Sequence, residues 1–158
     1  MPMKALHLVL TAAFVAVQAG PAQAQATAAA PEPAAAASVA PTSGKLTATL
    51  VGDLEVPDDG DPDGAGSAAI SIEGGKLCYK VEYHHLAPVT MAHIHVGAAG
   101  KAGEPVVNLT LDADENIAGC TPIASDLAAR LLAEPGAYYV NVHTTELPKG
   151  AIRGQLGK

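Results

Sequence analysis

The chain is short of aromatic and of cationic residues. It contains no tryptophan, one phenylalanine and four tyrosines, so aromatic side chains make up only 3% of its 158 residues. A hydrophobic core must therefore be built from valine, leucine and isoleucine, with few large side chains. Lysine and arginine number 9 against 16 acidic residues, which gives a formal net charge of −7. That balance argues against a nucleic-acid-binding protein, which would have to neutralise a run of phosphates, and against adsorption to an anionic membrane surface.

A hydrophobic run long enough to cross a membrane is also missing. The apolar stretch at 6–17 falls short of the roughly 20 residues that a spanning helix needs. It follows Lys4 and precedes two A-x-A patterns that end at Ala24 and Ala26, which is the arrangement of a secretory signal peptide. We therefore predict a signal peptide over residues 1–26, cleaved after one of these two alanines, and a periplasmic or secreted protein.

The rest of the chain divides into a linker and one folded domain. Residues 27–43 are rich in alanine and interrupted by three prolines, which predicts a disordered linker. Residues 44–158 are long enough to bury a core. Apolar positions in this domain alternate in short runs separated by Gly, Pro and Asp-Gly turn signals. Strands are expected near 46–50, 68–73, 77–83, 91–96, 105–111, 137–144 and 151–156.

This strand pattern predicts an all-β fold, an antiparallel sandwich or barrel. One segment has helical spacing instead, and Ser125 is expected to cap a short helix there. The stretch at 112–123 is expected to be a long loop.

The chain has only two cysteines, Cys78 and Cys120. An even number in an exported protein favours a disulfide, and the pair lacks the C-x-x-C spacing of a redox site. We predict a disulfide between Cys78 on a strand and Cys120 in the long loop, with Cα atoms about 4.4–6.8 Å apart.

Histidines carry the clearest chemical signal. His93 and His95 lie in the run MAHIHVG, where residues i and i+2 of a strand share a face. His143 ends the run YYVNVH, in which valines alternate with polar residues. Three imidazoles that converge can bind copper or zinc. The alternative is that the three are half-buried histidines with hydrogen bonds inside the fold. His84 and His85 fit neither pattern.

Other motifs are incomplete or missing. The loop DDGDPDG at 58–64 matches the first half of a calcium-binding loop, but Ile70 stands where a bidentate Glu is needed. The same residue types suit any tight turn. The chain has no G-x-S-x-G, H-E-x-x-H or phosphate-loop motif.

Three segments resemble the CHRD domain family, named from chordin. They are LTATLVGDLEVP at 46–57, HIHVGAAGKAGEPVVNL at 93–109 and YYVNVHTTELPKGAIRGQL at 138–156. The resemblance extends over residues 44–158, although the acidic loop departs from the family's usual sequence. It implies an extracytoplasmic β-domain, which in chordin is part of a secreted antagonist of growth factors.

A more distant similarity is to copper/zinc superoxide dismutase, a Greek-key β-barrel that binds copper through an H-x-H pair and a histidine from a later strand. It implies a Greek-key sandwich or barrel, with His93, His95 and His143 as the copper ligands. The chain lacks that enzyme's recognisable zinc-binding loop, so any such activity would be of a zinc-free kind.

The sequence therefore predicts an exported CHRD-domain protein that binds a transition metal, copper ahead of zinc, through His93, His95 and His143. The alternative is a non-catalytic structural or protein-interaction module without metal. A third reading is a copper-only enzyme similar to superoxide dismutase, and the sequence leaves enzymatic activity open. No nucleic acid and no membrane span are expected, and a protein partner is not identified by the sequence.

Overall fold

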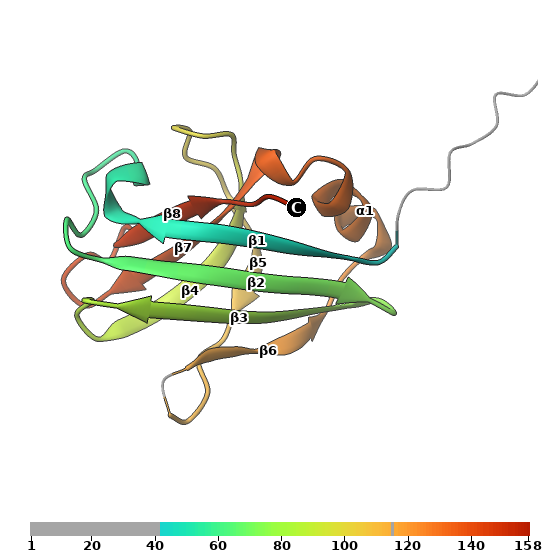
Figure 1. Cartoon of the computed structure of the whole chain (residues 1–158), viewed down its shortest axis with the longest axis horizontal. Coiled ribbons are helices and arrows are strands. Elements are labelled where there is room, and N and C mark those ends of the chain that lie inside the picture. Colours follow the sequence, from blue (N-terminus) through green and yellow to red (C-terminus); the bar gives the residue numbers. More distant parts are fainter. Residues whose placement is uncertain (1–41, 115) are drawn as a thin grey trace, which may run out of the picture. The chain divides into compact units, whose positions relative to one another are not determined.

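The computed structural model describes residues 42–158 except residue 115. The predicted signal peptide at 1–26 lies outside the described residues, as does all of the predicted linker but its last two residues. In the described part of the chain, strands predominate (Figure 1). The strands are β1 (Gly44–Val51), β2 (Ala65–Glu73), β3 (Lys76–His84), β4 (Val89–Val96), β5 (Pro105–Leu109), β6 (Ile117–Pro122), β7 (Tyr138–Thr144) and β8 (Ile152–Gln155). The helices are η1 (Gly52–Leu54), α1 (Ser125–Ala133) and η2 (Pro135–Ala137).

All of these strands belong to one antiparallel sheet in the order β5-β4-β7-β8-β1-β2-β3-β6. Leu111, just after β5, forms an isolated bridge with Ile117 at the start of β6. The two edges of the sheet therefore approach each other, and the sheet curls into a nearly closed barrel. β6 returns beside β3, and β7 returns beside β4, which is a Greek-key arrangement. The predicted fold class, an antiparallel Greek-key sandwich or barrel with one short helix, is confirmed.

The barrel interior is filled by aliphatic side chains that alternate along the strands. In β1, the side chains of Leu46, Ala48 and Leu50 are buried while the residues between them are exposed. Ile94 of β4 and Val140 of β7 are fully buried in the same way. Burial of one face of each strand is what the apolar alternation predicts.

Helix α1 packs beside the start of β1 (Figure 1). It buries Ala128, Leu131 and Leu132. A Cβ atom on Gly44 would come within 2.7 Å of Leu132 Cδ2, so the glycine allows this close approach. The predicted helix cap was wrong, because Ser125 is the first helical residue and no side chain caps the helix. No helix in the described part of the chain is long and apolar enough to cross a membrane.

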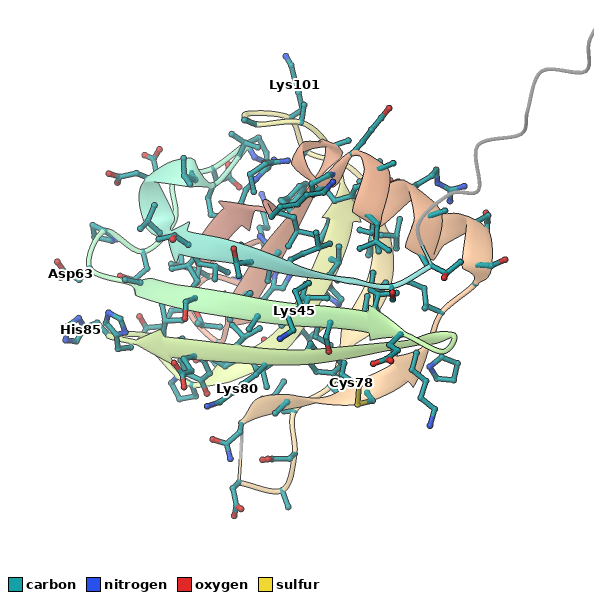
Figure 2. The ribbon with its side chains drawn as sticks, turned by 45° about the vertical axis from the view of Figure 1, so that its right-hand side comes forward. Lys45, Asp63, Cys78, Lys80, His85 and Lys101 are labelled. Carbon is teal, nitrogen blue, oxygen red and sulfur yellow. A yellow bond between two sulfur atoms is a disulfide. The ribbon has the colours of Figure 1, made fainter. Side chains whose placement is uncertain are left out.

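Cys78 and Cys120 form the predicted disulfide, with an S–S distance of 2.04 Å; Figure 2 labels Cys78. The predicted loop at 112–123 was wrong in part, because β6 occupies 117–122 and contains Cys120. The two cysteines are directly opposed in β3 and β6, with Cα atoms 3.9 Å apart. This distance is shorter than the predicted range.

Candidate metal centre

The three predicted ligands lie on the outer face of two adjacent strands. β4 and β7 are paired antiparallel, and the opposed residues include Met91 and His143, His93 and Asn141, and His95 and Tyr139. Opposed residues share a face of a sheet. His93, His95 and His143 therefore project to the same side, away from the aliphatic core. The sequence pattern alone did not predict that β4 and β7 pair with each other.

The three imidazoles lie together. One ring nitrogen from each lies within 4.8 Å of the corresponding nitrogens of the other two. His93 Nδ1 and His143 Nε2 are 3.1 Å apart, and the ring centroids of His93 and His95 are 5.4 Å apart. Nitrogens that share one ion at bond lengths of about 2.0–2.1 Å are roughly 3–4 Å apart. The cluster needs only a small contraction to reach that spacing.

Backbone carbonyls hold two of the rings through Nδ1. His95 Nδ1 donates to the carbonyl oxygen of Gly103 at 2.8 Å, and His143 Nδ1 donates to that of Pro148 at 3.1 Å. A carbonyl only accepts, so in each neutral ring the proton sits on Nδ1 and Nε2 keeps its lone pair. His95 Nε2 is buried and has no hydrogen-bond partner among the described residues. Histidines that bind metals are typically oriented in this way by a bond from the other ring nitrogen.

Burial keeps the three imidazoles uncharged. It lowers the pKa of His143 from 6.5 to about 4, and repulsion from a charged His93 acts in the same direction. Burial also lowers the pKa of His93 and that of His95. The unprotonated ring is the form that binds a metal ion. The cluster is therefore in its ligand form at neutral pH.

Tyr139 stacks on His95, and Arg153 stacks on Tyr139. The ring of Tyr139 lies nearly parallel to that of His95, with centroids 4.9 Å apart and planes 11° apart. The Cζ atom of Arg153 lies 3.4 Å from the centroid of the same Tyr139 ring. A guanidinium over an aromatic face is an attractive cation–π contact. The stack restricts the orientation of the His95 ring from the side of β8.

Arg153 also fastens the loop at 97–104. The residue is only 1% exposed, and its Nη2 donates to the carbonyl oxygens of Ala98 and Lys101. Figure 2 shows Lys101 at the tip of this loop. Gly103, whose carbonyl holds His95, belongs to the same loop. A surface salt bridge would be the ordinary expectation for an arginine on a strand, but the partners that Arg153 has here are main-chain carbonyls.

A buried carboxyl lies beside the centre. Glu55 is 8% exposed and accepts a hydrogen bond from Nδ2 of Asn141, the residue opposite His93. Burial raises the pKa of Glu55 to about 7, although the charge of Arg153 opposes that shift. Sequence reasoning missed Glu55 because only the folded loops bring it to β7. Tyr139 and Asn141 could have been found, because they alternate with His143 along one strand face.

The other histidines lie elsewhere. His84 and His85 are exposed at the end of β3, with ring centroids 5.2 Å apart. Figure 2 shows His85 and Asp63 at the same end of the domain. In residues 42–158 without residue 115, the only group of three or more His, Cys, Asp or Glu side chains arranged to hold a metal is the three-histidine cluster.

The acidic loop has a local role. Asp61 Oδ1 accepts hydrogen bonds from the backbone N–H groups of Asp63 and Gly64, each at 3.0 Å. This is an Asx turn, in which a side chain stabilises its own loop. Asp58, at the start of the same loop, forms an exposed ion pair with Lys149, with Nζ and Oδ2 3.0 Å apart.

Comparison with known proteins identifies a family. The family model of the CHRD domain matches residues 46–156, a range that includes the three candidate ligands and both cysteines. No curated protein and no solved structure matches the chain. The similarity to superoxide dismutase therefore stays a prediction. Because the match spans more than half of the 158 residues, the chain belongs to the CHRD domain family.

Proposed function

We propose that this chain is an exported CHRD-domain protein that binds one transition-metal ion, copper ahead of zinc, through His93, His95 and His143. The observation that carries the proposal is the grouping of three imidazole nitrogens within 4.8 Å of one another. Two of the rings are oriented by backbone carbonyls, and all three have a lowered pKa. A bound copper ion would supply a redox-active centre on the outer face of the barrel. The protein's own contribution is to hold three neutral nitrogens in place.

Export is supported by two features. The run at 1–26 has the composition of a secretory signal peptide. The Cys78–Cys120 disulfide is of a kind that persists in oxidising compartments and is rare in the cytosol. The mass of the mature protein tests this directly, because export predicts a chain that begins at residue 25 or 27. A full-length chain that stays in the cytoplasm would contradict export.

A metal-free interaction module is the second candidate, and one contact favours it. His93 Nδ1 and His143 Nε2 lie at hydrogen-bonding distance, 3.1 Å. With His143 Nε2 unprotonated, His93 can donate to it, and both rings are then satisfied without an ion. Under this alternative the cluster stabilises the β4–β7 pair, and the function lies in contacts with another protein.

The test is metal analysis of the full chain produced in an oxidising compartment. After equilibrium dialysis with copper or zinc, we expect about one equivalent of metal in the wild type. His93→Ala and His143→Ala should each lose most of it. His84→Ala is the matched control, because it removes an exposed histidine outside the cluster and should load like the wild type.

Thermal unfolding of each variant identifies any that fails to fold, and His93→Ala guards against that outcome because His93 is less buried than His143. A folded wild type that loads neither metal would overturn the proposal in favour of the interaction module. Superoxide removal measured on the loaded protein separates a copper-binding protein from a copper-dependent enzyme.

A further inference from the structure

We propose that Met91 is a fourth ligand at this centre, and that its thioether makes the site prefer copper(I) over zinc. The inference rests on the proposed three-histidine site and specifies which ion that site selects. It starts from a residue that neither the H-x-H pattern nor the family signature singles out.

Strand register places Met91 beside two of the three histidines. Met91 is directly opposed to His143 across the β4–β7 pair, and it precedes His93 by two residues in β4. Opposed residues on one face have Cβ atoms about 4.5–5.5 Å apart, and residues i and i+2 share that face. A methionine side chain is unbranched and has three rotatable bonds. Its sulfur can therefore reach an ion that His93 and His143 hold.

The Met91 side chain is not held in the core and is free to turn toward the histidines. It is 45% exposed on the outer face of β4, whereas Val89, Ala92 and Ile94 of the same strand are buried. Together with His93, Asn108 and Thr110 it lines an open hollow of about 390 Å³ between β4 and β5. Packing in the core therefore does not account for Met91. The hollow gives an ion, or a small carrier of it, access to the His93 side of the cluster.

Ligand softness decides which ion the four side chains favour. Thioether sulfur is a soft ligand that selects copper(I), whereas imidazole accepts copper and zinc alike. Met91 is the only methionine in residues 42–158, and both cysteine sulfurs in the same range are joined in a disulfide. Any sulfur bound to the ion by this domain must therefore come from Met91. Three neutral imidazoles and a neutral thioether also suit an ion of low charge.

The test compares Met91→Leu with the wild type in the full-length mature protein. Leucine keeps the size and apolarity of the side chain and removes the sulfur. Copper(I) affinity is measured by competition with bicinchoninate under ascorbate and without thiols, which would reduce the Cys78–Cys120 bond. We expect Met91→Leu to weaken copper(I) binding by at least about tenfold and to leave zinc binding within about twofold. Val96→Ala is the matched control, because Val96 is exposed on the same strand but alternates onto the other face.

X-ray absorption at the copper edge supplies a readout of the bond itself. The wild type loaded with copper(I) should show one sulfur neighbour, and Met91→Leu should show none. Equal copper(I) affinities in the two proteins, with no sulfur neighbour in the wild type, would overturn the Met91 assignment while the three-histidine site stands. A wild type that binds neither copper nor zinc would overturn both proposals.

Discussion

The outer face of β1 is open to solvent, whereas the outer face of β7, on the other side of β8, is covered. Along β1 the outward side chains of Thr47 and Thr49 are exposed. Along β7 the outward side chains of Tyr139, Asn141 and His143 are all buried, and so is every other residue of that strand. The two strands bury similar aliphatic residues inside the barrel. What differs is that other segments cover the outward side chains of β7, which form a buried polar layer outside the barrel.

Hydrogen bonds identify the segments that cover this second face. The loop at 97–104 is bonded to Arg153, the segment at 145–151 to His143, and Glu55 to Asn141. Buried polar atoms normally find partners, and those that do not are informative. Among the described residues, the buried side-chain atoms without a partner are His95 Nε2, Asn141 Oδ1 and Arg153 Nη1. All three belong to the covered face, on which the proposed metal ligands also lie.

Removing the disulfide should have the largest effect on stability. The double variant Cys78→Ala/Cys120→Ala removes the bond between β3 and β6, whose cysteines are 42 residues apart in the chain. We expect the free energy of unfolding, measured with urea, to fall by about 4 kcal/mol, because the unfolded chain is no longer constrained by a closed loop. Copper loading of the protein that remains folded should be unchanged, since the bond joins β3 to β6, whereas the three histidines lie on β4 and β7. A loss below about 1 kcal/mol would show that the bond is not a main support of the fold.

Arg153→Ala tests the covered face directly. It removes a buried guanidinium and its hydrogen bonds to the carbonyls of Ala98 and Lys101, of which Ala98 keeps a bond from the Lys101 backbone N–H. We expect a loss of about 3 kcal/mol in urea unfolding and faster hydrogen exchange in the loop at 97–104. Lys80→Ala is the counterpart on the open face, where it breaks an exposed ion pair with Glu82 and should leave stability nearly unchanged. Similar losses in the two variants would remove the distinction between the faces.

A smaller effect is expected from pH in the metal-free protein. The pKa of His143 is lowered from 6.5 to about 4, so its contribution to stability is present above pH 6.5 and is lost as pH falls toward 4. The wild type should therefore lose about 2 kcal/mol more than His143→Gln between pH 7 and pH 4.5. Urea unfolding of both proteins at the two pH values measures this difference.

Glu55 acts in the opposite direction over a similar range. Its pKa is raised from 4.5 to about 7, so the folded state gains stability as pH falls from about 7 toward 4.5. This contribution is present in the wild type and in His143→Gln, and it cancels when the two are compared. Parallel pH profiles for the two proteins would show that His143 is not held neutral by its surroundings.

The two faces also differ in how far their structure can be predicted from sequence. β1, β2 and β3 were predicted because one side of each meets water and the other the core, which imposes a period of two on polarity. β6 was missed because IAGCTP has no such alternation. His93 and His95 could be paired from their spacing alone. The position of His143 beside them depends on the strand order, which local polarity does not encode, and Glu55 and Arg153 depend on loops folding over β7 and β8.

The distance along the chain between the histidines sets when the site can exist. His93 and His143 are separated by 50 residues and become neighbours only after β7 docks against β4. An ion that meets the nascent chain finds at most the adjacent pair His93 and His95, which cannot complete a three-nitrogen site. Under the proposed function, metal capture is therefore a late event that follows the pairing of β7 with β4. An ion bound there binds only the folded state, so by mass action it raises the free energy of unfolding and holds β4 and β7 together.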